Sequence, residues 1–404
     1  MIDNPSIPGI TYPLGFRAAG GTCGIKKSGK PDLVLIVADN TCTAAGVFTT
    51  NKVPGAPVII SKRHVKNGKV RAIVVNSGCA NVATGKSGEA DAVKMCEAVA
   101  QQVGCAASEV LVCSTGVIGH HLPMNKIIPG IAQLYMKIGS GPTTDQQVAT
   151  AILTTDLVMK TSYRSINIGG KEVRIAGIAK GSGMIQPNMA TMLAFITTDC
   201  AISAPMLRWS LQQASSATFN RLSVDHDTST SDSAMILASG LAGNKKIATK
   251  GKAAGQFAEA LEEVCRELAY QIVKDGEGAT KVFRVTVKGA RSVADADKVG
   301  YTVTGSPLVK TAVHGADPNW GRLAAAAGRS GAAIDPAKLT ITIGGTTVLK
   351  KGVNLNADLA PLEAHMKGTE VDFVIDLGLG KHTVQWLGCD LSREYIAINA
   401  DYMT

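Results

Sequence analysis

Hydrophobic and polar positions along this chain repeat with two different periods, one typical of strands and one typical of helices. Short β-branched runs at 32–38, 71–75 and 109–113 predict buried strands, because each run ends in polar turn residues. Two further apolar runs, at 173–179 and 192–196, have the same character and enclose a turn-rich loop. The sequence therefore predicts a core built around strands.

Helical spacing occupies the intervals between the predicted strands. Residues 87–103 predict a helix, with Ser87 as its N-cap and Gly104 placed to end it. A second helix is expected over 205–219, capped by Ser203. A third shows one apolar stripe made of Phe257, Leu261, Val264, Leu268 and Ile272. Helices and strands that alternate in this way indicate an α/β or α+β fold.

The balance of helix and strand changes near Thr280. From Phe283 onward the sequence is rich in strand-forming residues, whereas the part before it is richer in helices. We therefore expect a larger domain at 1–280 and a smaller C-terminal α/β domain at 281–404.

Charge narrows the classes of partner. The chain has 41 Lys and Arg against 32 Asp and Glu, a formal net charge of +9, and aromatic residues make up only 4%. The densest basic stretch, 61–71, contains no aromatic residue, and single-stranded nucleic acid is usually held by aromatic stacking. We therefore expect small acidic substrates and no nucleic acid.

The cysteines and the apolar runs indicate the cellular compartment in which the protein is expected. Nine cysteines are scattered without a CxxC pair, which argues against a disulfide framework and favours small core residues. No apolar run approaches the roughly 20 residues of a membrane helix, and the first residues lack the pattern of a signal peptide. A cytoplasmic protein without a membrane partner is expected.

The loop between the two apolar runs ends in Ala190 and Thr191, a small residue followed by a hydroxyl at a strand entrance. The Thr191 hydroxyl could attack the preceding carbonyl and free a new amino terminus. That amine has a pKa of about 7.7–8.0, so it would serve as the base for its own hydroxyl. From these residues alone, a glycine-rich connection with Thr191 as an ordinary strand residue is the favoured interpretation.

The full segment 180–193 resembles the signature of the ornithine acetyltransferase family of arginine biosynthesis, also called glutamate N-acetyltransferase. Its pattern, Lys-Gly-x-Gly-Met-Ile-x-Pro-Asn-Met-Ala-Thr-Met-Leu, is complete here. The resemblance implies an αββα sandwich of the N-terminal-nucleophile type that cleaves itself after Ala190 into chains 1–190 and 191–404. It also implies acetyl transfer from N2-acetylornithine to glutamate through acetyl-Thr191, with ping-pong kinetics, and a heterotetramer of two cleaved units.

The resemblance also implies roles for individual residues. An oxyanion hole is expected from Thr115 and Gly116, which follow the strand at 109–113. The expected substrate-binding residues are Thr154 (with Thr155 as the fallback), Lys180, Thr191, Glu277, Asn399 and Thr404. Asp156 is followed by Leu157 and Val158 where the family more often has Thr and Pro, so the edge of the pocket is less well defined.

Neither a cofactor nor a metal is expected. The segment Asp225-His226-Asp227 lacks the spacing of a metal motif. Some members of the family accept acetyl-CoA as a second acetyl donor, and the sequence leaves that open. Two other functions also remain open: a self-processing aminopeptidase or amidohydrolase that uses water as acceptor, and an uncleaved binding protein.

Overall fold

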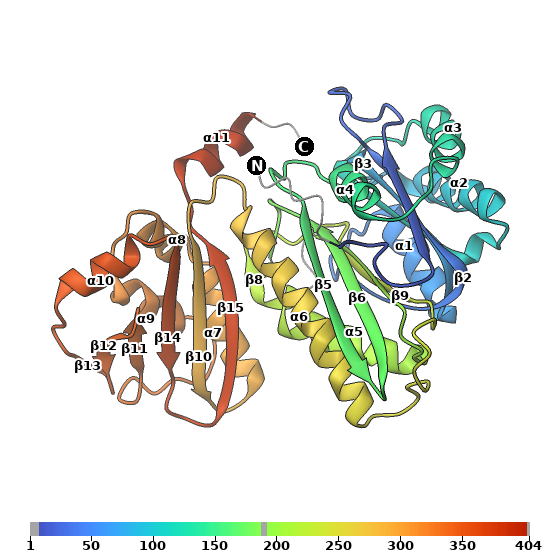
Figure 1. Cartoon of the computed structure of the whole chain (residues 1–404). Coiled ribbons are helices and arrows are strands. Elements are labelled where there is room, and N and C mark those ends of the chain that lie inside the picture. Colours follow the sequence, from blue (N-terminus) through green and yellow to red (C-terminus); the bar gives the residue numbers. More distant parts are fainter. Residues whose placement is uncertain (1–7, 187–191, 402–404) are drawn as a thin grey trace.

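The computed structural model describes residues 8–186 and 192–401, which form two lobes side by side (Figure 1). The larger lobe holds an eight-stranded sheet and the smaller lobe a seven-stranded sheet, counted over the described residues. The chain fills the larger lobe first, so most of the smaller lobe comes from its last third.

The sheet of the larger lobe has the order β4-β3-β2-β9-β7-β6-β5, with β1 paired to β2. Its strands are β1 (Phe16–Gly21), β2 (Leu33–Phe48), β3 (Lys69–Cys79), β4 (Val110–Val117), β5 (Lys160–Ile168), β6 (Lys171–Lys180), β7 (Leu193–Thr198) and β9 (Ser233–Ala238). Its helices are α1 (Ala56–His64), α2 (Gly85–Val103), α3 (Met124–Tyr135), α4 (Pro142–Ala151), α5 (Ala204–Ala217) and α6 (Lys252–Lys274), with short 3₁₀ turns at Val65–Asn67, Ala107–Glu109 and Phe219–Arg221.

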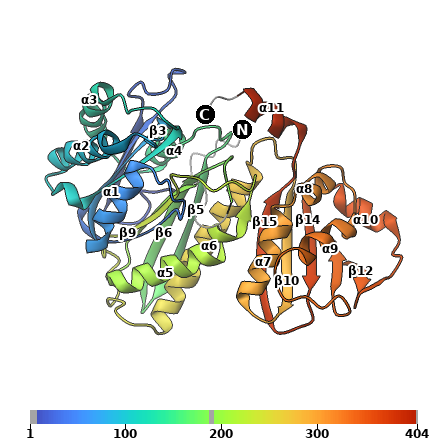
Figure 2. The same ribbon diagram turned by 180° about the vertical axis from the view of Figure 1, so that it is seen from behind.

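Three hydrophobic layers show that this sheet folds over on itself. Along β2, Leu35 faces a cluster shared with α1, α2 and α3, whereas Ile36 faces an inner cluster. Along β7, Phe195 faces the same inner cluster and Ile196 faces a third one, shared with α5 and α6. The alternation follows from the two-residue period of a strand. The order of layers is therefore helix, sheet, sheet, helix, and the expected αββα sandwich is confirmed (Figures 1 and 2).

The smaller lobe is a second α/β unit with its own core. Its sheet has the order β13-β12-β11-β14-β10-β15-β8. The strands are β8 (Leu222–Ser223), β10 (Val282–Ala290), β11 (Thr340–Ile343), β12 (Thr346–Lys350), β13 (Val353–Asn354), β14 (Glu370–Asp376) and β15 (His382–Cys389), and the helices are α7 (Val293–Thr304), α8 (Pro307–His314), α9 (Trp320–Gly328) and α10 (Leu359–Met366). A last helix, α11 (Arg393–Asp401), buries none of its side chains.

A short strand links the two lobes. The short strand β8 leaves the larger lobe and pairs in parallel with β15. The expected domain boundary near Thr280 lies just before β10, which begins at Val282, and the boundary stays a prediction.

One local expectation was wrong. Helix α2 begins at Gly85 with Thr84 as its N-cap, so Ser87 lies inside the helix. Asn81 and Ala83 both have positive φ, and this tight turn lets the helix start earlier. Gly104 does end α2, in the left-handed conformation that glycine adopts without strain.

Candidate active site

Strands β6 and β7 bring both sides of the proposed cleavage segment together. They pair antiparallel, and Lys180, the last residue of β6, is the register partner of Leu193, the first residue of β7. Ala190 and Thr191 themselves, and Thr404, lie outside the described residues. The structure therefore fixes the positions of Lys180 and Leu193, which precede and follow the predicted nucleophile in sequence.

Three predicted site residues meet at the end of β6. The Lys180 ammonium donates a hydrogen bond to Thr154 Oγ1 at 2.9 Å and a longer one to Thr115 Oγ1 at 3.4 Å. Thr115 lies near the end of β4, and Thr154 lies in the segment after α4. Residues 26 and 65 positions away from Lys180 therefore contact one ammonium group. The fallback, Thr155, instead shares a hydrogen bond with Ser182.

Gly116 has a backbone that other residues rarely adopt. Its φ is +128°, and a β-carbon there would overlap the backbone of Gly78 on the adjacent strand β3. Gly78 and Gly116 are register partners in the parallel β3–β4 pair. The Thr115-Gly116 turn thus requires glycine at its second position.

A buried carboxylate balances the Lys180 charge. Asp156 has no exposed side-chain surface and lies 4.0 Å from Lys180 Nζ. Burial raises the pKa of Asp156, but the Lys180 and Lys160 ammonium groups outweigh it and hold that pKa well below its usual range. Burial also lowers the pKa of Lys180, with Asp156 opposing the shift. The result is a charged cluster shielded from water.

Glu277 lies just past the end of α6 and contacts the segment that follows Lys180. Its backbone N–H donates to Ser182 O at 2.8 Å, and its carboxylate accepts from Asn399 Nδ2 at 2.9 Å. A β-carbon at Gly183 would overlap that carboxylate. Two predicted substrate residues, Glu277 and Asn399, are therefore in contact, although 122 positions separate them.

Sequence analysis missed a carboxyl group that contacts Met192, the residue after the proposed nucleophile in sequence. Asp232, fully buried before β9, accepts a hydrogen bond from the backbone N–H of Met192 at 3.0 Å. Burial raises its pKa well above the ordinary value, against the Met192 hydrogen bond and the Lys180 charge. It lies in the polar run 223–233 of the sequence, where nothing distinguishes it from its neighbours until the parallel β7–β9 register is known.

Other polar residues of the chain have structural partners. Asp225 accepts the backbone N–H of Ile185 at 2.7 Å, and Asn319 caps α9. Within residues 8–186 and 192–401, no group of three His, Cys, Asp or Glu side chains has the arrangement of a metal site. All nine cysteines are free, and most are buried. No helix in these ranges is long and apolar enough to cross a membrane.

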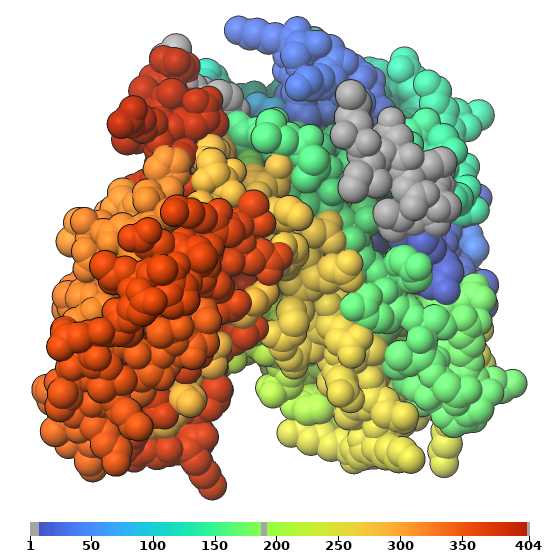
Figure 3. Space-filling view, turned by 60° about the vertical axis from the view of Figure 1, so that its left-hand side comes forward, coloured from blue at the N-terminus to red at the C-terminus, as the bar shows by residue number. Residues whose placement is uncertain are grey.

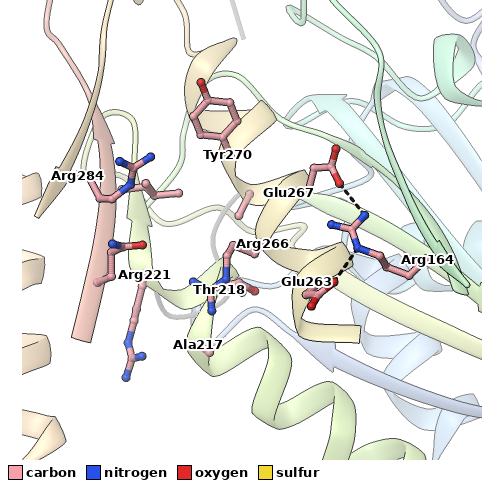
Figure 4. A pocket seen from close by; sticks show the side chains of 12 residues that line it. Arg164, Ala217, Thr218, Arg221, Glu263, Arg266, Glu267, Tyr270 and Arg284 are labelled. Carbon is pink, nitrogen blue, oxygen red and sulfur yellow. Dashed lines mark hydrogen bonds and ion pairs between the residues drawn. The ribbon is translucent and has the colours of Figure 1, made fainter. Parts of the chain in front are cut away.

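A cavity of about 510 Å³ opens between the lobes, away from the residues described above. Figure 3 shows the hollow between α6 and the smaller lobe, and Figure 4 shows the side chains around it. Four arginines line it, and each has an acidic partner; the pairs are Arg164 with Glu263 and Glu267, Arg221 with Asp297, Arg266 with Glu262, and Arg284 with Asp372. None of the predicted site residues within 8–186 and 192–401 lines this cavity.

Comparisons with known proteins agree with one another. The model of the ArgJ family matches residues 17–404. The arginine biosynthesis bifunctional protein ArgJ of Dehalococcoides mccartyi is 46% identical over 397 residues, which cover 98% of this chain and 97% of that protein. The protein of the same name from Gloeobacter violaceus is 47% identical over 400 residues, covering 98% of each.

A crystal structure is also similar. The arginine biosynthesis bifunctional protein argJ from Bacillus halodurans has a TM-score of 0.50 and 39% sequence identity, and the match covers 52% of this chain and 98% of that chain.

Replacing Asp232 by Asn tests whether this carboxyl is held neutral. An acid whose pKa is raised by folding stabilises the fold below its unfolded pKa of about 3.9, and that stability is lost as pH rises toward the folded value. Asp232→Asn keeps an oxygen for the Met192 N–H but has no proton to lose. The melting temperature of the variant relative to the wild type should therefore rise between pH 5 and pH 8.

The exposed Asp317→Asn serves as the control, and its offset from the wild type should stay the same across this range. An Asp232→Asn offset that is equally independent of pH would show that Asp232 is ionised in the folded protein.

Proposed function

This chain belongs to the ArgJ family, and we propose that it transfers the acetyl group of N2-acetylornithine to glutamate through Thr191. It is an acetyltransferase of arginine biosynthesis. Family membership over residues 17–404 favours transfer over the aminopeptidase alternative, in which water would be the acceptor. The observation that carries the mechanism is the contact of the Lys180 ammonium with the hydroxyls of both Thr115 and Thr154.

The first step of the proposal is self-cleavage. The Thr191 hydroxyl attacks the Ala190 carbonyl carbon, the C–N bond breaks, and the nitrogen takes up a proton to become the new amine. Water then hydrolyses the resulting ester, which releases the 1–190 chain and restores the hydroxyl. The two chains share one sheet, because β6 of the first pairs with β7 of the second and β2 of the first pairs with β9 of the second, so we expect them to stay together.

In the first half-reaction, the freed α-amine takes the proton of the Thr191 hydroxyl as its oxygen attacks the acetyl carbonyl. The amide C–N bond breaks, the proton passes to the leaving nitrogen, and ornithine departs. In the second half-reaction, the glutamate amine attacks acetyl-Thr191, the C–O bond breaks and the hydroxyl regains a proton. One amide replaces another, so no high-energy donor or cofactor is needed.

The contacts of Thr115 suit it to an oxyanion hole. Its oxygen accepts a hydrogen bond from the Lys180 ammonium, which leaves its own O–H free to donate to a developing negative charge. The N–H of Gly116 follows in the same turn. Removing one such donor from an enzyme costs about 2.7–4 kcal/mol of transition-state stabilisation. The buried Lys180 charge adds to the stabilisation because the surroundings exclude water.

Substrate recognition follows from the two charged ends of the site. The substrate carboxylate would lie near Lys180 and Thr154, and the side-chain ammonium of ornithine near Glu277. Asn399, and Thr404 five positions later in sequence, would complete the Glu277 side. We further propose the heterotetramer of two cleaved units and a cytoplasmic location. Acetyl-CoA as a second donor would acetylate the same Thr191.

Incubation with N2-acetylornithine and labelled glutamate tests the proposal. The wild type should yield labelled N-acetylglutamate, whereas free acetate alone would mean hydrolysis. Thr191→Ala should remain one uncleaved chain on a denaturing gel and lose transfer below detection, because it lacks the nucleophile.

Thr191→Ser is the matched control, since it keeps a hydroxyl and should keep measurable cleavage and transfer. Normal turnover by Thr191→Ala would refute the assignment. An added arm with acetyl-CoA and glutamate, without ornithine derivatives, decides whether the second donor is used.

Glu277→Gln should selectively weaken binding of the acetyl donor, N2-acetylornithine. A hydrogen bond to a charged group contributes about 1.5–3 kcal/mol, so KM for N2-acetylornithine should rise about 10- to 100-fold, at about 1.4 kcal/mol per tenfold change. The amide still offers an oxygen to Asn399. KM for glutamate, which has no side-chain ammonium, should change much less.

Glu363→Gln, on the exposed face of α10, is the control and should leave both constants at their wild-type values. Equal increases of both KM values in Glu277→Gln would mean that Glu277 does not bind the ammonium group.

A further inference from the structure

Lys160 is a lysine that the proposed chemistry does not use, yet it is completely buried. It is the first residue of β5, its relative exposure is 0%, and it is among the largest fully buried side chains of the described residues. Its register partner across β5–β6 is Ala179, the neighbour of Lys180. A buried lysine is costly unless its charge is paired, so its partners should explain its presence.

The Lys160 ammonium bridges two carboxylates. It donates to Asp156 Oδ1 at 2.7 Å and to Asp275 Oδ2 at 2.6 Å, and to the backbone oxygen of Val158 at 3.2 Å. Asp156 and Asp275 lie 119 positions apart in sequence. Three protons on the ammonium match three acceptors, so the group is fully satisfied.

On the Asp156 side, the bridge contacts the part of the site that is proposed to bind the substrate carboxylate. Asp156 accepts the backbone N–H of Thr154 at 3.0 Å and that of Gly181 at 2.6 Å. These two residues are, respectively, the predicted substrate residue and the neighbour of Lys180. Asp156 therefore fixes both groups proposed to hold the substrate carboxylate.

On the Asp275 side, the bridge lies close in sequence to Glu277, which is proposed to bind the side-chain ammonium of ornithine. Asp275 is the C-cap of α6 and lies two residues before Glu277. It also accepts the backbone N–H of Leu157 at 3.1 Å, which ties the end of α6 to the segment after Asp156. The position of Glu277 thus depends on where this helix end is held.

We propose that Lys160 is a positioning residue that sets the distance between the carboxylate-binding and ammonium-binding ends of the substrate site. This inference rests on the proposed function, because it assumes that Lys180 and Glu277 bind the two ends of one diamino acid. Lys160 itself touches neither end. It acts through Asp156 toward Thr154 and Lys180, and through Asp275 toward Glu277.

The charges explain why a lysine is needed at this position. Lys160 and Lys180 carry two positive charges, and Asp156 and Asp275 carry two negative ones, all at side chains with at most 6% exposure. Without Lys160, two shielded carboxylates would face one ammonium group. Their repulsion would push Asp156 and Asp275 apart and separate the segments that they hold.

The test compares two donors that differ only at the ammonium end: N2-acetylornithine and N2-acetylnorvaline, which has the same carbon chain without the side-chain amine. Lys160→Met, which keeps an unbranched side chain one atom shorter and removes the charge, should lower the preference for acetylornithine, measured as the ratio of the two kcat/KM values. A misplaced binding group costs on the order of 10- to 100-fold, so we expect a fall in this range.

A purely structural role would lower kcat/KM for both donors equally and leave the ratio unchanged, which would overturn the inference. A double variant, Lys160→Met with Asp275→Asn, guards against loss of folding. It removes one positive and one negative charge, so the fold should recover while the bridge stays absent, and the donor preference should remain reduced. A wild-type preference in this double variant would also overturn the inference.

The control for the charge is Lys160→Arg, which keeps a cation between the carboxylates and should retain more of the preference than Lys160→Met. Acetyl transfer by the wild type is measured in the same assay. Failure of the wild type to transfer acetyl would count against the proposed function, whereas an active wild type with an unchanged ratio in Lys160→Met counts only against the role of Lys160.

Discussion

The pairing of β6 with β7 is the constraint on which the rest of the site depends. Because Lys180 and Leu193 are register partners, the loop between them must begin and end at one place on the sheet. The parallel pairing of β7 with β9 then sets Asp232 beside Met192, and the β3–β4 pair brings in the Thr115-Gly116 turn. Sheet register, more than loop conformation, gathers the chemical groups.

Burial determines how these groups behave. Lys180 and Lys160 keep their place only because Asp156 and Asp275 accompany them, and Asp232, which has no ammonium group bonded to it in the described residues, has its pKa raised instead. A site of this kind excludes water and strengthens every charge interaction inside it.

Local periodicity predicts individual strands well, such as 173–179 and 192–196, and both are strands in the fold. The αββα order of the layers, by contrast, is implied by the family resemblance. The sequence also predicts the motif residues, since Lys180 and Thr115 lie in recognisable segments. It could not predict Lys160, Asp275 or Asp232, because their importance lies in contacts between segments more than 30 positions apart. The start of α2 could not be predicted, because Ala83 in the preceding turn has a positive φ that alanine rarely adopts, and α2 therefore begins before Ser87.

The central claim is that Thr191 becomes the amino terminus of a new chain and carries the acetyl group. The most direct measurement is mass spectrometry of active protein, quenched in acid after incubation with N2-acetylornithine but no acceptor. The account predicts a peptide that begins at Thr191 and bears one acetyl group, as an ester that hydroxylamine removes and added glutamate discharges. An active preparation with an intact bond between Ala190 and Thr191, or with its acetyl group on Lys180 instead, would contradict it.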